Sequence, residues 1–276
     1  MSLFNPLNKF NVGYALSGGG ARGFAHLGAL KALEERRIKP DILAGTSAGA
    51  LAGVLYADGF TPEEISEMFT HTKFKQFIEF TFPTTGLFRP TGLNDFLKRN
   101  LRSKTFEQLQ LPFVAVATDW DKGTTVNFSE GDKLIESVVA SCCVPLIFSP
   151  VYINDRPYVD GGIFKNLPAS TIRKKCRVLF GINVSMIMPP EEKHNLKYIA
   201  ERTFNMMSIS NTIADLKLCD VLIEAKDIER YWMFDLSNIN TIFDKGYESA
   251  VNKLKEKKAT NAIIKSKAFE LLNFKK

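Results

Sequence analysis

Residues 12–23 read VGYALSGGGARG, a β-prone run followed by three glycines and Arg22. In residues 22–37 the spacing of Leu27, Leu30 and Leu33 predicts a helix. Consecutive glycines carry no side chains, so their N–H groups can converge near the N-terminus of that helix. The stretch therefore predicts an anion-binding loop between a strand and a helix. Its ligand would be a phosphate or the oxyanion of an acyl-transfer intermediate.

The same stretch also matches G-x-G-x-x-G, the dinucleotide-binding fingerprint. That fingerprint requires an acidic residue about 20 positions later, at the carboxyl end of the second strand. Asp41 has about this separation, but it precedes the strand predicted at residues 42–44 and would lie at the wrong end. An oxyanion loop is therefore favoured over a nucleotide site.

A second glycine-containing motif, Gly45-Thr46-Ser47-Ala48-Gly49, lies between the strand predicted at residues 42–44 and a helix predicted at 47–56. G-x-S-x-G in this setting is typical of a nucleophile elbow, in which Gly45 and Gly49 let strand and helix approach closely. The helix N-terminus would favour negative charge on the Ser47 oxygen. Ser47 is therefore the candidate nucleophile.

A nucleophilic serine needs a base, and the chain has three histidines, His26, His71 and His194. His194 lies in a polar loop typical of a surface residue, and His71 is also expected to be solvated. His26 lies one turn beyond Arg22 on the same predicted helix face, where it would support the glycine loop. None of the three is a convincing base.

The remaining candidate is Asp160, which follows a short β-prone run and precedes Gly161 and Gly162. Two glycines would leave its carboxylate accessible to a reacting group. An ordinary Asp-Gly turn explains the same pattern, so both interpretations stay open on these residues alone.

Together, the glycine loop, the G-x-S-x-G elbow and the late Asp-Gly-Gly resemble the patatin-like phospholipases. The likeness extends through residues 23–28, 41–49, 140–150 and 166–168 and covers about residues 12–185. It implies a Ser47–Asp160 dyad. It also implies that Gly18, Gly19 and Gly20 supply the N–H donors of the oxyanion hole. Arg22 would support the site by orienting the loop or by meeting an anionic headgroup. The other supporting residues would be Gly45, Gly49, Gly161 and Gly162.

The resemblance implies a serine acyl hydrolase of the phospholipase A or lysophospholipase type, acting on phospholipid, lysophospholipid or another acyl ester. Such a mechanism needs no metal and no cofactor. An ordinary aspartate, with a pKa near 4, would be a poor base at neutral pH. The alternative is a lipid-sensing or regulatory protein that uses the same pocket with little turnover.

Strands alternating with helices predict an α/β fold, and the resemblance specifies a three-layer α/β/α sandwich with a mainly parallel central sheet. Without a linker-like segment, residues 1–276 are expected to form a single domain. Residues 60–96 hold eight of the 22 Phe. They are interpreted either as core packing or as an apolar cap over a site for lipids.

The net charge of +6 lies entirely in residues 245–276, which hold nine Lys and three acidic residues. A neutral body with a basic appendage argues against nucleic acid as a partner. This basic helical tail would either dock on the core with solvated lysines or contact an anionic membrane peripherally.

The protein is expected to be cytoplasmic, and peripheral contact with a membrane is left open as an alternative. No signal peptide or membrane-spanning segment is recognisable. The cysteines form neither a disulfide framework nor a metal motif, which fits buried thiols in a reducing compartment. They are Cys142, Cys143, Cys176 and Cys219. The oligomeric state is left open.

Overall fold

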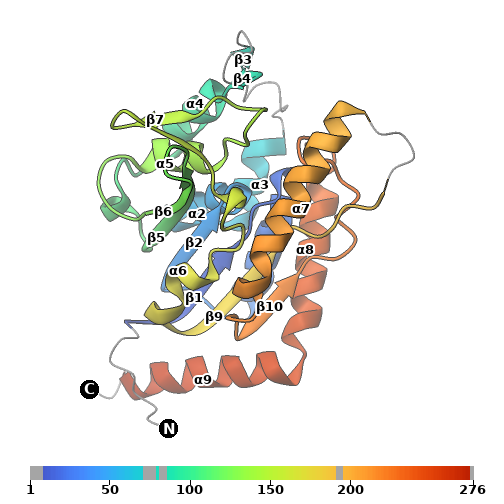
Figure 1. The fold of residues 1–276 in the computed structure, drawn as a ribbon. Coiled ribbons are helices and arrows are strands. Elements are labelled where there is room, and N and C mark those ends of the chain that lie inside the picture. Colours follow the sequence, from blue (N-terminus) through green and yellow to red (C-terminus); the bar gives the residue numbers. More distant parts are fainter. Residues whose placement is uncertain (1–8, 71–78, 81–85, 191–194, 274–276) are drawn as a thin grey trace.

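A mainly parallel β-sheet forms the middle layer of the protein in a computed structural model that describes residues 9–70, 79–80, 86–190 and 195–273 (Figure 1). Its strand order is β10-β9-β1-β2-β5-β8-β7, with β6 paired to β5. The strands are β1 (Phe10–Leu16), β2 (Ile42–Thr46), β5 (Phe113–Asp119), β6 (Thr124–Phe128), β7 (Val151–Ile153), β8 (Arg156–Asp160), β9 (Cys176–Asn183) and β10 (Val221–Glu224).

The strands β10, β9, β1, β2 and β5 run parallel, whereas β6, β7 and β8 pair antiparallel. Leu16 at the end of β1 pairs with Gly45 near the end of β2. Parallel strands end at the same edge of a sheet, so the segments that follow β1 and β2 emerge side by side. This register brings the glycine loop next to the serine elbow.

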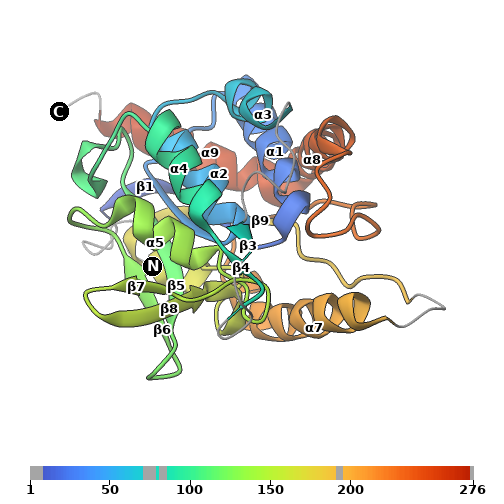
Figure 2. The same cartoon turned by 90° about the horizontal axis from the view of Figure 1, so that it is seen from above.

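Helices cover both faces of the sheet, which confirms the predicted three-layer α/β/α sandwich (Figures 1 and 2). One face carries α1 (Phe24–Glu35), α2 (Ala48–Ala57), α5 (Leu134–Ser141) and α8 (Ile239–Leu254), and the other carries α6 (Ala169–Ile172) and α7 (Leu196–Leu216). Each face of the sheet packs on its own hydrophobic core, and successive side chains of β1 point to opposite faces. Tyr14 and Leu16 pack into one core, and Ala15 packs into the other.

The basic tail forms parts of two helices rather than one. Within it, α8 packs lengthwise on α1, and α9 (Lys257–Asn273) lies beneath the amino ends of the strands (Figure 1). Ala259, Ala262 and Ser266 of α9 are buried, and Asn11 Nδ2 donates a hydrogen bond to the Ser266 carbonyl at 3.0 Å. The described part of α9 is thus docked on the body, at the edge opposite the ends of β1 and β2.

The Phe-rich segment contains α3 (Pro62–Thr70), β3 (Glu79–Phe80), β4 (Phe88–Arg89) and the start of α4 (Thr91–Asn100). Phe69 and Phe96 are buried, with ring centroids 4.7 Å apart, as the core-packing interpretation expects. Phe74, Phe77 and Phe82 lie outside the described residues, so the cap interpretation stays a prediction.

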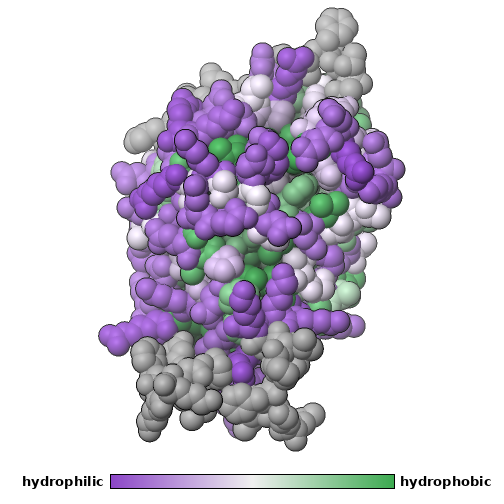
Figure 3. Space-filling view, turned by 90° about the vertical axis from the view of Figure 1, so that its left-hand side faces the viewer, coloured by the Kyte–Doolittle hydropathy of each residue, from purple (hydrophilic) through white to green (hydrophobic). Residues whose placement is uncertain are grey.

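The described residues also contain short 3₁₀ turns: η1 (Gly20–Gly23), η3 (Phe106–Gln108), η4 (Gly161–Ile163) and η5 (Arg173–Lys175). The face that includes β6 and β7 is mainly hydrophilic, with apolar side chains in small groups between polar ones (Figure 3). Among the helices of the described ranges, none combines the length and apolar character needed to cross a membrane.

Candidate active site

Ser47 occupies the sharp turn between β2 and α2. Its backbone has φ 53° and ψ −122°, a left-handed conformation that non-glycine residues rarely adopt. Its N–H donates to Ser141 Oγ at 2.8 Å, and Ser141 Oγ donates in turn to the Val116 carbonyl at 2.6 Å. The strained turn is therefore fixed from the neighbouring strand β5, as a nucleophile elbow requires.

The elbow glycines lie where backbone segments approach closely. A Cβ on Gly45 would lie 2.3 Å from the Gly49 carbonyl oxygen, and a Cβ on Gly49 would lie 2.3 Å from the Leu16 carbonyl oxygen. Any side chain at either position would separate α2 from the strands. Both glycines thus serve the close strand–helix contact expected from the motif.

Asp160 ends β8 and is fully buried. Gly162 N–H donates to Asp160 Oδ1 at 2.7 Å, and a Cβ on Gly161 would lie 2.3 Å from the Val116 carbonyl oxygen. Burial raises the pKa of the Asp160 carboxyl to about 7, while the Gly162 N–H and the Ser47 hydroxyl act in the opposite direction. This environment gives the carboxyl a pKa suited to accepting a proton near neutral pH.

The glycine loop lies beside Ser47, since a Cβ on Gly18 would lie 3.3 Å from Ser47 Cβ. Gly18 N–H already donates to the Asn166 carbonyl at 3.0 Å, so this N–H is engaged within the protein. Within the described residues, the N–H groups of Gly19 and Gly20 donate no hydrogen bond. Gly20 has φ +58°, a conformation that favours glycine.

Arg22 and His26 hold this loop from inside the protein. Both side chains are fully buried. Arg22 Nε donates to the Gly19 carbonyl at 3.2 Å, and His26 Nε2 contacts the Ser17 carbonyl at 2.8 Å. Burial lowers the pKa of His26 to about 4, so its ring is neutral and Nε2 carries the proton that it donates. These contacts fit a loop-supporting role for both residues, and the full burial of Arg22 keeps its guanidinium from a headgroup in solvent.

The Asp-Gly-Gly turn is held by α7. Asn211 Nδ2 donates to the carbonyls of Gly162 at 2.8 Å and Ile163 at 3.1 Å, and Asn211 Oδ1 accepts the Asn166 N–H at 2.8 Å. Ser208 Oγ donates to the Gly162 carbonyl at 3.3 Å. Two polar side chains of one helix thereby fix the backbone that follows Asp160.

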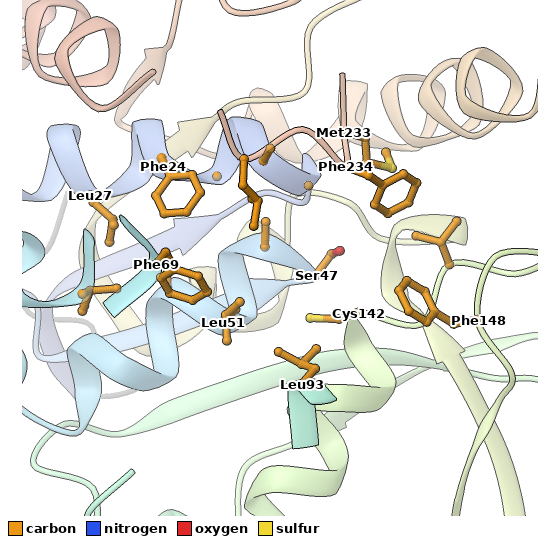
Figure 4. Close-up of a pocket in the computed structure, with 18 residues that line it drawn as sticks. Phe24, Leu27, Ser47, Leu51, Phe69, Leu93, Cys142, Phe148, Met233 and Phe234 are labelled. Carbon is orange, nitrogen blue, oxygen red and sulfur yellow. The ribbon is translucent and has the colours of Figure 1, made fainter. Parts of the chain in front are cut away.

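An apolar cavity of about 130 Å³ opens beside the serine. Figure 4 shows Ser47 projecting among the side chains that line this cavity. Apolar members of the lining include Phe24, Leu51, Phe69, Leu93, Phe148 and Phe234. Such a wall would hold a hydrocarbon chain with one end at the serine oxygen.

Cys142 also lines the cavity and is the least buried of the four free cysteines. Burial raises the pKa of its thiol well above the ordinary value, and the Asp160 carboxylate acts in the same direction. The thiol is therefore protonated at neutral pH and is no rival to Ser47 as the nucleophile.

Of the other candidates from the sequence, Asp41 does not join the site. His71 and His194 lie outside the described residues. Asp41 accepts the N–H groups of Asn11 and Val12 at 3.0 and 2.8 Å, at the amino end of β2, where a ribose-binding acid would be misplaced. Within the described ranges, no group of three or more His, Cys, Asp or Glu side chains could hold a metal ion.

Several residues at the site were missed by sequence reasoning as functional candidates. Asn211 and Met233 lie 164 and 186 positions after Ser47 and carry no motif of their own. Ser141, 94 positions after Ser47, lies in the family-like segment 140–150 but was given no role. Their contribution depends on long-range packing, which brings α5, α7 and the segment after β10 to the edge that holds Ser47. A single sequence offers no signal for such contacts.

Comparison with known proteins identifies the family to which this chain is related. The family model described as patatin-like phospholipase matches residues 14–172. An uncharacterized NTE family protein of Mycobacterium tuberculosis is 33% identical over 163 residues, which are 58% of this chain and 45% of that protein. Patatin-like phospholipase domain-containing protein 7 of Mus musculus is 32% identical over 188 residues, which are 63% of this chain and 13% of that protein.

The chain thus spans less than half the length of these relatives. Among solved structures, VipD from Legionella pneumophila superimposes with a TM-score of 0.59 at 14% identity, over 89% of this chain and 67% of that chain. This likeness supports the fold alone. Because the family model covers more than half of the sequence and all three motifs, the chain belongs to the patatin-like phospholipase family.

Proposed function

We propose that this protein is a serine acyl hydrolase that cleaves carboxylic ester bonds of lipids through Ser47 and Asp160. The observation that carries the proposal is the buried Asp160 carboxyl, whose pKa of about 7 is influenced by the Ser47 hydroxyl. It answers the difficulty that an ordinary aspartate is too weak a base at neutral pH. Family membership and the apolar cavity beside Ser47 point to a lipid acyl chain as the substrate group.

In the first half of the reaction, Asp160 would take the Ser47 proton while the serine oxygen attacks the ester carbonyl carbon. The carbonyl oxygen would become an oxyanion facing the N–H groups of Gly19 and Gly20, which have no internal acceptor in the described residues. Collapse of this intermediate would break the ester C–O bond. Asp160 would return the proton to the departing alcohol and leave an acyl-Ser47.

In the second half, Asp160 would take a proton from water, and the resulting hydroxide would attack the acyl carbon. A second oxyanion would form at the same loop and collapse to release the fatty acid. The proton would return to Ser47. Each bond change is completed by groups of this chain and water alone.

The cavity supports phospholipids, lysophospholipids and related acyl esters as the substrate class. Its walls are mainly apolar, with little to fix the position of a charged headgroup. Selection among headgroups would therefore depend on contacts outside the cavity. Acyl-chain length is the property on which this wall should discriminate.

The decisive experiment compares wild type with Ser47→Ala on a panel of lipid esters, together with labelling by a fluorophosphonate probe. The matched control is Ser137→Ala, because Ser137 is also a buried serine but donates to the Leu134 carbonyl within α5. We expect Ser47→Ala to lose hydrolysis and labelling and Ser137→Ala to keep both. Equal labelling of wild type and Ser47→Ala contradicts the assignment, and lipid binding without turnover supports the lipid-sensing alternative.

A further inference from the structure

Glu201 of α7 is a buried carboxylate outside the part of the chain that matches the family. Its Oε1 accepts the Met233 N–H at 2.8 Å and lies 3.8 Å from Arg22 Nη2. One carboxylate thereby connects a residue of the glycine loop with the segment that follows β10. Neither Ser47 nor Asp160 is a partner in these contacts.

Both partners of Glu201 hold the glycine loop, and they do so on different backbone groups. Arg22 Nε donates to the Gly19 carbonyl at 3.2 Å. The Met233 carbonyl accepts the Ala21 N–H at 2.7 Å. Gly20 lies between these two attachments, and a Cβ there would lie 2.3 Å from the Met233 carbonyl oxygen.

We infer that Glu201 is a positioning residue for the oxyanion loop, because it fixes Arg22 and Met233 and these fix the backbone on both sides of Gly20. The inference rests on the proposed function, in which Gly19 and Gly20 face the oxyanion. Donors of this kind stabilise a transition state only when they are set in advance at hydrogen-bonding distance. A displacement of about 1 Å at a reacting centre costs about a hundredfold in rate.

Charge gives a second reason for a carboxylate at this position. The Arg22 guanidinium is completely buried, and burial of a cation without a partner is costly. Burial lowers the pKa of Arg22, and the Glu201 carboxylate acts in the opposite direction. An uncharged residue at position 201 would therefore weaken the hold on Arg22 even where it could still accept the Met233 N–H.

The test compares Glu201→Gln with Asp220→Asn. Asp220 is a matched control because its carboxylate also pairs with an arginine, Arg173 at 2.6 Å, and also accepts a backbone N–H, that of Leu179 at 2.8 Å. That pair lies at the amino end of β10, away from the glycine loop. Both variants weaken a carboxylate–arginine pair, but only Glu201→Gln does so beside the loop.

We expect Glu201→Gln to lower kcat by about 10- to 100-fold with KM within about twofold. Hydrogen exchange of the loop amides of Ala21 and Arg22, which donate to the Met233 and Gly19 carbonyls, should speed up in this variant. Asp220→Asn should keep wild-type kcat and loop protection, although its melting temperature falls. If Glu201→Gln matches Asp220→Asn in both kcat and loop exchange, the inference is overturned.

The double variant Arg22→Met with Glu201→Leu removes both buried charges at once. It therefore distinguishes a positioning role of Glu201 from an effect on the stability of the protein alone. We expect a melting temperature close to that of wild type and a kcat that stays low. Recovery of kcat together with stability overturns the inference. Absence of Ser47-dependent hydrolysis in wild type would instead contradict the proposed function, while loop exchange still tests the role of Glu201.

Discussion

Residues 14–172, which match the family, and the C-terminal part from residue 173 differ in what they bring to the site. The first part holds every atom proposed to react, in the glycine loop, Ser47 and Asp160. The second part holds none of these atoms, but its contacts through Glu201, Asn211 and Met233 add to the support that Arg22, His26 and Ser141 of the first part provide. The reacting groups and this added support are thus divided along the chain, although both lie at one edge of the sheet.

Because of this division, a sequence motif can identify the reacting residues without identifying all the residues that position them. Variants in the first part should change the chemistry itself. Variants in the second part should change how well the site is arranged, so they should lower the rate without altering which group titrates.

The largest effect is expected from Asp160→Asn, which removes the proposed base. We expect hydrolysis to fall by at least about 10³-fold. Because the folded-state pKa of Asp160 is raised to about 7, the wild type loses stability as pH rises from about 4 toward 7. The neutral amide avoids that loss, so the melting temperature of Asp160→Asn should exceed that of wild type by about 4 °C or more at pH 8.

Thermal unfolding at pH 8 and pH 4 and an ester assay at pH 8 measure these effects. The stability gain should shrink to a small part of its pH 8 value near pH 4, where Asp160 is protonated in the folded state and about half protonated in the unfolded state. Asp119→Asn is the matched control, since Asp119 is buried and accepts the Lys122 N–H at 3.0 Å. Asp160→Asn with wild-type turnover would remove Asp160 from the mechanism.

The pH dependence of the wild type should be the next largest effect. Asp160 acts as a base only when it is deprotonated, so kcat/KM should fall about tenfold for each pH unit below about 7. A profile of kcat/KM from pH 5 to 9 measures this midpoint. A profile that stays nearly level down to pH 5, as an ordinary aspartate pKa of about 4 would give, would contradict the proposed environment of Asp160.

Asn211→Ala tests the second part of the chain with a smaller expected effect. Loss of its bonds to Gly162, Ile163 and Asn166 should loosen the turn after Asp160 and lower kcat by about tenfold. The midpoint of the pH profile should stay near 7. A large displacement of that midpoint would break the division between reacting and positioning groups.

Asn205→Ala is the control for this variant, because Asn205 lies on the same helix and also ties down a loop. Its Oδ1 accepts the Met188 N–H at 3.1 Å, and its Nδ2 donates to the Met186 carbonyl at 3.0 Å. We expect a similar loss of stability, measured by thermal unfolding, with kcat close to wild type. Equal losses of kcat in both variants would mean that α7 acts only through overall stability.

Sequence patterns predicted the first part of the molecule far better than the second. The β1–glycine loop–α1 and β2–elbow–α2 units are local, so spacing and glycine positions predicted them directly. The orientation of α7, by contrast, could not be predicted. Glu201, Asn205 and Asp215 face the body, whereas Ile199, Met206 and Ile213 are exposed, the reverse of an ordinary amphipathic helix.

The reason for this reversal lies in the loops that α7 covers. The segments around Gly162 and Met188 present backbone groups without partners in a strand or helix, and polar side chains of α7 satisfy them. Hydrophobic periodicity assumes that apolar residues face the core, so it assigns the two faces of such a helix the wrong way round. The positions of Glu201 and Asn211 at the site were unpredictable for the same reason.

The smallest effect is expected from the basic tail. Lys255, Lys258 and Lys265 are exposed, and α9 lies at the amino ends of the strands (Figure 1). Ser47 lies at the opposite, carboxyl end of β2. A membrane bound at α9 would therefore hold the cavity away from its surface. We expect substitution of all three lysines by Gln to change hydrolysis of anionic vesicles by less than about twofold at about 0.1 M salt, where exposed charges are screened beyond about 10 Å. A salt-sensitive loss of vesicle binding with a parallel loss of hydrolysis would instead assign membrane recruitment to this tail.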